Sequence, residues 1–129
     1  MAVRTKEEAA EIAASWWAEK VARPVYNAGA DSMAMVMAEV MATVNATKVE
    51  ETEQERFKKI LKKKILEKIE NAKYTFGIHC DYAPEGILSE AMMEASIPTS
   101  NAPWKTSMWI DADGTVSVKH GYGRGVVDL

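Results

Sequence analysis

The chain has 129 residues, 47% of them apolar and 27% charged, with a formal net charge of -3 at pH 7. This length supports one hydrophobic core and is short for two, so we expect a single domain over residues 1–129. The mild negative charge argues against nucleic acid as a partner, and no segment approaches the roughly 20 apolar residues of a membrane span. A single cysteine and a start without an apolar signal segment favour the cytoplasm.

The first expected helix begins at a capping box, in which Thr5 and Glu8 bond each other's backbone N–H groups. It should run to about Ala22, because Pro24 disfavours helical geometry just before it. The helical spacing places Trp16 on the buried stripe and Trp17 at its edge. The full predicted stripe is Ala9, Ile12, Ala13, Trp16 and Lys20 or Val21.

A second helix is expected from Asp31 to about Val44. Between Met33 and Val44 the only charged residue is Glu39, so this helix must be buried on most faces. A central core helix is the favoured interpretation, and an interface between subunits is the alternative. The second possibility is one reason to expect a homo-oligomer.

A third helix has two alternative capping boxes, Thr47 with Glu50 and Thr52 with Glu55. Its predicted core face is Phe57, Ile60, Leu61, Ile65, Leu66, Ile69 and Ala72. Basic residues cover most of the other side: Arg56, Lys58, Lys59, Lys62, Lys63, Lys64 and Lys68. A phosphate-binding stripe is possible, but nearby glutamates nearly balance these charges and no aromatic residue is interleaved, so a solvated face is favoured.

From Tyr74 to Tyr82 the pattern alternates, which predicts a half-buried strand with Ile78 and Cys80 on the apolar side. Pro84 suits the first turn of a fourth helix, and Pro98 should close it. Residues 105–111 and 115–120 then form a hairpin around the turn 111–114. The chain should therefore be an α+β domain: three N-terminal helices, then strand, helix and C-terminal β-hairpin, with a small, mostly antiparallel sheet packed on the helices.

Metal and cofactor sites are not expected. The run Asp111-Ala112-Asp113-Gly114 resembles the start of a calcium loop, but Val116 and Tyr122 stand where such a loop has glycine and glutamate. The neighbours His79 and Cys80 are too few ligands for zinc. No phosphate-binding glycine loop opens a helix, so the sequence predicts no cofactor.

Catalysis by Cys80 with His120 as its base is a third-ranked hypothesis, because the two could meet across a sheet. The alternation places Cys80 on the apolar side, where free cysteines usually act as small buried hydrophobic groups. A structural role is favoured, and we predict no catalytic residues.

The aromatic and basic residues near the C-terminus form the candidate ligand site. Trp104, Trp109 and Tyr122 could stack on a planar group, while Lys105 and Arg124 supply donors for phosphate or carboxylate. The competing interpretation is structural: tryptophans are mostly core residues, and the glycines around Tyr122 could simply bend an edge strand.

Several of these segments resemble segments of a known group of proteins. The sequence is similar to small accessory proteins of phages and prophages of Gram-positive bacteria. The similar segments are Asp81-Tyr82-Ala83-Pro84, residues 88–91, Pro103 to Trp109, Gly121-Tyr122-Gly123 and the pair Trp16-Trp17. The resemblance implies a protein acting in the bacterial host cytoplasm, where such proteins often block host defence. It implies no catalytic residues.

Together these observations favour a non-enzymatic phage-type protein that binds or sequesters a small anionic or nucleotide-like ligand. The alternative is an interaction inhibitor that docks on a host defence protein. A cysteine-dependent enzyme is the third hypothesis.

Overall fold

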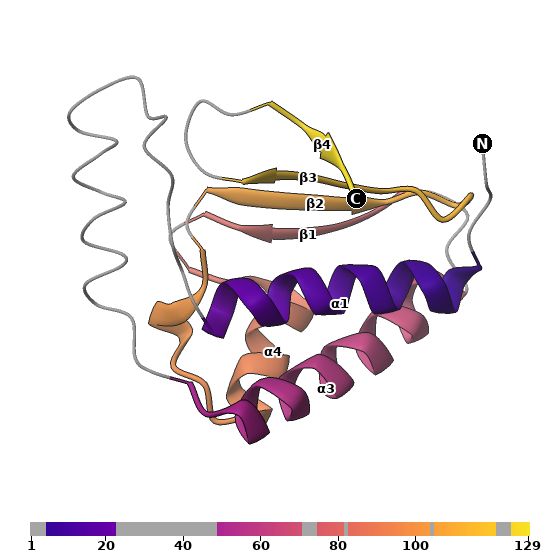
Figure 1. Cartoon of the computed structure of the whole chain (residues 1–129). Coiled ribbons are helices and arrows are strands. Elements are labelled where there is room, and N and C mark those ends of the chain that lie inside the picture. The colour runs from indigo at the N-terminus through magenta and orange to yellow at the C-terminus, as the bar shows by residue number, and fades with distance from the viewer. Residues whose placement is uncertain (1–4, 23–48, 71–74, 82, 104, 121–124) are drawn as a thin grey trace.

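The computed structural model describes residues 5–22, 49–70, 75–81, 83–103, 105–120 and 125–129 (Figure 1). The described elements are α1 (Lys6–Ala22), α3 (Glu51–Glu70), β1 (Phe76–Cys80), α4 (Gly86–Glu94), the short 3-10 helix η1 (Thr99–Asn101), β2 (Thr106–Ile110), β3 (Val116–His120) and β4 (Val127–Asp128). The α+β class is confirmed. The predicted helix 31–44 lies outside the described residues, so the described order is two helices, strand, helix and three strands.

The four strands form one antiparallel sheet in the order β1-β2-β3-β4. The predicted hairpin is confirmed: Asp111 N–H donates to the Thr115 carbonyl at 2.9 Å, and Gly114 takes the left-handed φ of 90° that closes the turn. The strand β4 was not predicted. It joins the outer side of β3, where the Ser117 hydroxyl donates to the Asp128 carboxylate at 2.8 Å.

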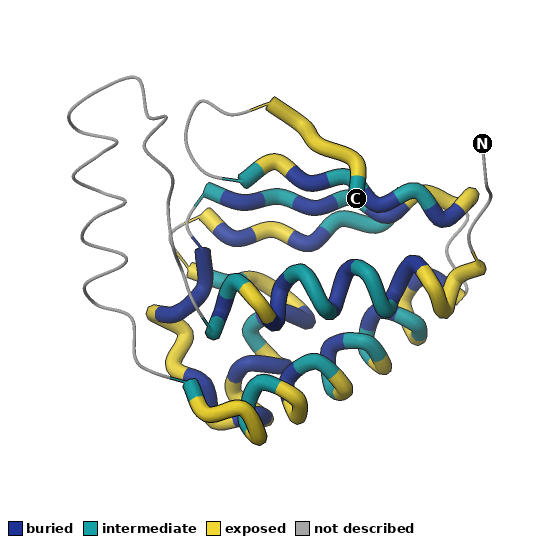
Figure 2. Tube along the Cα trace, viewed as in Figure 1, coloured by how far each residue is buried: buried dark blue, intermediate teal, exposed yellow. Residues whose placement is uncertain are grey.

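One face of the sheet is buried against the helices. Along β2 and β3 buried residues alternate with less buried ones, as the two-residue period of a strand requires (Figure 2). Ile78 and Cys80 of β1 lie on the same inner face and are almost fully buried. The predicted inward side of each of these strands is therefore confirmed.

The helix α1 begins at the predicted capping box and ends at the predicted residue. Thr5 N–H donates to the Glu8 carboxylate and Glu8 N–H donates to the Thr5 hydroxyl, both at 3.1 Å. The assignment of the two tryptophans was wrong. Trp17 is fully buried, and its Nε1 donates to Met108 Sδ at 3.2 Å, whereas Trp16 lies at the edge and is only partly buried.

The reason for this shift is that α1 is buried on two sides. It lies between the sheet and α3, and α3 packs on α1 and α4 rather than on the sheet itself (Figure 1). The helices thus cover the sheet only partly, through α1 and α4. Small residues beside the predicted stripe are also buried, whereas its members Ile12 and Trp16 are only partly buried. The buried residues of α1 are Ala9, Ala10, Ala13, Ala14, Trp17, Ala18 and Val21.

Hydrogen bonds to other elements hold α1 at both ends. Lys6 donates its ammonium to the carbonyl of Glu70, the last residue of α3, at 3.0 Å. At the other end, Gln54 donates to the Ala18 carbonyl at 3.3 Å and the buried Asn101 amide donates to the Val21 carbonyl at 2.9 Å. Val21 is in the last turn of α1, where carbonyls have no partner within the helix, so the bond from Asn101 satisfies a buried group that would otherwise be unpaired.

The helix α3 begins at Glu51, one residue before Thr52. The box of Thr52 with Glu55 is therefore wrong, since Thr52 lies inside the first turn, and Thr47 of the other box lies outside the described residues. Instead, Glu50 N–H donates to the Glu53 carboxylate at 3.2 Å. The predicted core face is confirmed for its fully buried members Phe57, Leu61, Ile65 and Ile69, with Ile60 and Leu66 partly buried; Ala72 is not described.

The basic face of α3 is used in ion pairs with its neighbours. Lys58 and Lys62 contact the Glu11 carboxylate at 2.8 and 3.1 Å, and Lys64 contacts Glu94 at 2.9 Å. The bond from Lys58 is the main reason that the pKa of Glu11 is lowered. A phosphate on this face would have to compete with these carboxylates, which weakens the phosphate-stripe alternative.

Both prolines expected to bound the fourth helix act differently. Pro84 forms an isolated antiparallel bridge with Cys80, and the helix begins only at Gly86, because the chain first turns back along β1. The helix ends at Glu94, before Pro98 can act. Its end is a Schellman motif in which Ser96 has a left-handed φ of 60° and Ile97 N–H donates to the Met92 carbonyl at 2.9 Å.

None of the helices in the described part of the chain is long and apolar enough to cross a membrane.

The two adjacent tryptophans provide a test of this packing. Trp17→Ala should lower the free energy of unfolding by about 3–5 kcal/mol, because it empties a fully buried site between α1 and β2. Trp16→Ala is the matched control and should cost about half as much, since its ring is only partly buried. Urea denaturation of the two variants measures the difference, and a larger loss for Trp16→Ala would contradict the packing described above.

Candidate functional site

Three of the five predicted site residues, Trp104, Tyr122 and Arg124, lie outside the described residues. Lys105 and Trp109 are described: Lys105 directly precedes β2, and Trp109 lies within it. The grouping of all five in one site therefore stays a prediction.

Lys105 occupies a constrained backbone position directly before β2. Its φ is 53°, in the left-handed region that non-glycine residues rarely adopt. Its N–H donates to the Asp81 carbonyl at 2.7 Å, and its ammonium forms an ion pair with the Asp81 carboxylate. These contacts join the end of β1 to the start of β2, so Lys105 fixes the entry into the strand that carries Trp109.

Trp109 lies on the face of the sheet that points away from the helices. Its register partners are Gly77 on β1 and Ser117 on β3, and it is partly buried. The ring of His79 meets it edge to face, with 6.1 Å between the ring centroids and 71° between the planes. This contact partly covers one side of the indole. The sequence alone offered no reason for a tryptophan to lie on the outer side of the strand.

The position of the His79 ring depends on Gly77. A Cβ atom at residue 77 would lie 2.5 Å from His79 Nε2, so any larger residue would displace the ring. On its other side the His79 Nδ1 atom lies 3.0 Å from the Ser107 hydroxyl, within hydrogen-bond distance. The imidazole is thus held between the backbone of β1, the indole of Trp109 and the hydroxyl of Ser107.

These residues define a polar and aromatic surface that we call the outer face. It consists of Gly77 and His79 on β1, Ser107 and Trp109 on β2, and Ser117 and Lys119 on β3. His79, Ser107 and Lys119 are paired in register across the three strands, directly beside the row that holds Trp109. The outer face therefore combines an aromatic ring with hydroxyl, imidazole and ammonium groups, which can stack on a planar ligand and donate to an anion.

Sequence reasoning missed His79, Ser107 and Lys119 as candidates. Alternation placed His79 opposite Cys80, on the same side as Gly77, and it placed Ser107 on the same side as Trp109. That signal was available, but the pairing of β1 with β2 was not, and only the pairing brings His79 against Trp109.

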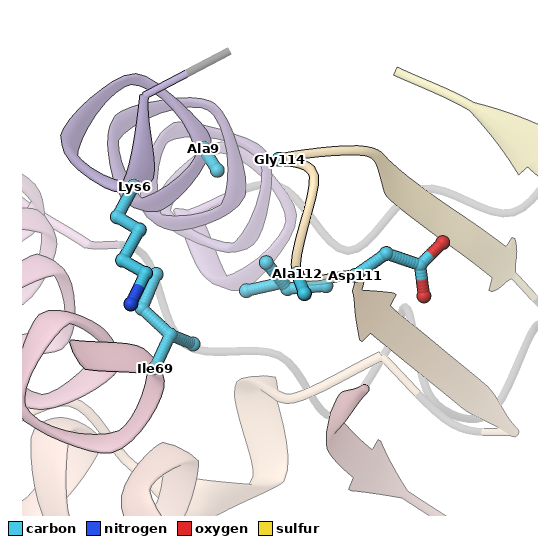
Figure 3. A pocket seen from close by; sticks show the side chains of 7 residues that line it. Lys6, Ala9, Ile69, Asp111, Ala112 and Gly114 are labelled. Atoms are coloured by element: carbon cyan, nitrogen blue, oxygen red, sulfur yellow. The ribbon is translucent and has the colours of Figure 1, made fainter. Parts of the chain in front are cut away.

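The aspartates of the hairpin turn have partners within the protein: Asp113 bonds within the turn, and Asp111 bonds to the residue before β1. Asp113 accepts from Thr115 N–H at 2.9 Å, and the Thr75 hydroxyl donates to Asp111 at 2.7 Å. The cavity beneath the turn has a volume of only about 10 Å³, enough for one water at most (Figure 3). In Figure 3 the Asp111 carboxylate points away from Lys6, so the two do not converge on a ligand. The described residues contain no cluster of three or more metal-binding side chains.

Cys80 is not placed as a nucleophile. Only 1% of its surface is exposed, and burial, with smaller contributions from Asp81 and Glu85, raises the pKa of its thiol to about 12. Thr106 lies between Cys80 and His120 in the register, and its hydroxyl is 3.3 Å from His120 Nδ1. The structure thus separates the predicted nucleophile from its predicted base, and it favours the structural interpretation of Cys80.

The sequence matches no protein-family model, and no curated protein is significantly similar to it. The functional argument therefore rests on the residues themselves.

Thiol labelling tests the environment of Cys80. We expect native protein to react with a disulfide reagent far more slowly than protein in urea, because the thiol is buried and protonated. Raising the pH from about 8 to about 10 should leave the native rate low, since the thiolate is not populated until near the raised pKa. Rapid stoichiometric labelling of the folded protein at neutral pH would show that the thiol is accessible and would revive the cysteine-enzyme hypothesis.

Proposed function

We propose that the protein is a non-enzymatic binding protein that captures a small anionic, nucleotide-like ligand on the outer face of its sheet. The observation that carries this proposal is Trp109, a large aromatic side chain on the face opposite the helices, with His79 against one edge. Isolated exposed apolar residues are common on proteins, but a tryptophan supported by an ordered imidazole forms a preorganised stacking surface.

The polar groups around Trp109 favour an anion with a planar ring. Lys119 is exposed on the neighbouring strand, and Ser107 and Ser117 bring hydroxyl groups to the same face. A base or similar ring would stack near the indole while Lys119 neutralises a phosphate or carboxylate. Trp104, Tyr122 and Arg124 are proposed to complete the site, as additional stacking and donor groups.

Lys105 is given a different role from the one its sequence position suggested. Because its ammonium already pairs with Asp81, a ligand anion would have to replace that carboxylate. We therefore propose that Lys105 positions β2 and that Lys119 supplies the nearer described ammonium. This assignment keeps Lys105 within the site as a structural support for Trp109.

The biological setting is proposed from the resemblance of the sequence motifs. A phage-type accessory protein in a bacterial cytoplasm would counter host defence by sequestering a nucleotide signal, and we propose that it does so as a homo-oligomer. Docking on a host defence protein is the alternative, and the described residues offer it exposed apolar groups: Met93 and Val127 are 71% and 59% exposed.

Calorimetry with a panel of nucleotides and cyclic dinucleotides tests the ligand proposal. We expect micromolar binding by the wild-type chain and a loss of about tenfold or more in Trp109→Ala, because stacking on an aromatic side chain contributes about 1–3 kcal/mol per base. Trp16→Ala removes a tryptophan from the helix side and should leave the affinity unchanged.

A second matched pair tests the charge. Lys119→Ala should weaken binding, whereas Lys59→Ala, which removes an exposed lysine of α3, should not. Absence of micromolar binding by any ligand of the panel, or equal affinity in Trp109→Ala and wild type, would contradict the proposal.

A further inference from the structure

The strand β1 forms one edge of the described sheet. The opposite edge is β4, which has only two residues and so offers little backbone for pairing. β1 has five residues, and within Phe76–Cys80 it contains no proline or lysine of the kind that protects edge strands. Among the described residues, its outer edge is paired only at one end, by the isolated bridge of Cys80 with Pro84.

The backbone orientation of β1 can be deduced from two hydrogen bonds. Asp111 N–H donates to Thr115, so the odd-numbered residues of β2 bond to β3 and the even-numbered ones face β1. Through the register, Phe76, Ile78 and Cys80 therefore bond to β2. The His79 carbonyl accordingly points outward, where it accepts from Glu85 N–H at 3.2 Å. Two residues earlier, Gly77 must direct its N–H and carbonyl to the same outer edge.

A groove runs beside this edge. It has a volume of about 350 Å³ and lies between β1, the start of α4 and the end of α3. Its lining includes Gly77 and Ile78 on β1, Glu85, Ile87 and Glu90 at or within α4, and Lys68 on α3. The groove thus places a sheet edge with available backbone groups beside apolar side chains and charged groups.

We propose that this groove binds an extended peptide segment of a partner protein, which adds to β1 as a further strand and presents a basic side chain to Glu85 and Glu90. Strand addition supplies backbone hydrogen bonds for affinity, and pockets for alternate side chains supply selectivity. Gly77 provides the outward backbone groups. Phe76, which is only partly buried, provides apolar surface for a peptide side chain, beside the nearly buried Ile78 and Ile87.

The charges of the groove favour a basic peptide. Two carboxylates and one ammonium line it, so the groove carries an excess of negative charge. A lysine or arginine of the peptide can place its charged end at the exposed carboxylate of Glu90. An acidic side chain at that position would be repelled by the two carboxylates, whereas a basic one is attracted. Both effects favour a basic peptide over an acidic one.

This inference is independent of the proposed ligand site. The ligand would occupy the outer face around Trp109, whereas the peptide would occupy the edge of β1 and the helix side; Gly77 and His79 border both surfaces. Failure of either proposal therefore leaves the other standing, because Trp109→Ala and Glu90→Lys alter different surfaces.

Heteronuclear NMR of the full isotope-labelled chain tests strand addition. The probes are the capped peptide Thr-Val-Lys-Val-Thr, the same peptide with Glu in place of Lys, and the Lys peptide with methylated backbone nitrogens. We expect millimolar to micromolar binding of the Lys peptide, with shifts concentrated at the amides of residues 76–79 and 86–90. The Glu peptide should bind about tenfold more weakly, as loss of a charge-assisted pair implies. Methylation should abolish binding, because it removes the donors that pair with β1.

Charge reversal provides the decisive variant. Glu90→Lys should favour the Glu peptide over the Lys peptide, whereas Glu94→Lys, one turn later on α4 and outside the groove, should keep the original order. Equal binding of the methylated peptide, or shifts at Ser107, Trp109 and Lys119 instead of residues 76–79 and 86–90, would overturn the proposal. A concentration-dependent dimer that protects the amides of β1 and is not displaced by peptide would also overturn it, in favour of self-pairing.

Discussion

The packing of α1 between the sheet and α3 is the constraint on which the rest of the structure depends. The helix buries five alanines, and because their side chains are so short, a sheet and a second helix can both approach its backbone closely. Trp17 is the large exception, and it fills the remaining space as far as Met108 on β2. Hydrogen bonds to other elements then fix the ends of α1: Lys6 donates to the end of α3, and Gln54 and Asn101 donate to carbonyls near the C-terminal end of α1. Once α1 is fixed in this way, the inner face of the sheet is fixed with it, and so is the direction of the outer face.

The sequence predicted those elements whose signals are local. Thr5 and Glu8 marked the start of α1 because a capping box involves only neighbouring residues. The alternation in β1, β2 and β3 predicted their buried sides because one face of the sheet is covered. The interpretation failed where burial came from two directions. Alanine is weakly apolar and common on both surfaces and interiors, so the pattern of alanines did not predict that the second side of α1 is buried. Trp17 was therefore placed at the edge.

Termini governed by distant contacts were also missed. Pro84 is compatible with a first helical turn, but the bridge to Cys80 delays the helix to Gly86. Ser96 adopts a left-handed conformation that nothing in its side chain predicts, and it ends α4 before Pro98. The candidate site shows the same division. Trp109 was predicted to point outward, and it does, whereas its contact with His79 depends on the register of β1 and β2, which no local pattern specifies.

Gly77 connects the two surfaces that the sheet presents. A β-branched residue would be the ordinary choice in the middle of a strand, since it stiffens the backbone and packs against its neighbours. Here the missing side chain has two consequences. On the outer face it leaves the space in which the His79 ring lies against Trp109, and at the outer edge of β1 it places no side chain beside the outward backbone groups that the register directs to the groove. A glycine lowers the intrinsic stability of a strand, so under the two proposals its presence at a position that borders both surfaces is explained by what approaches β1.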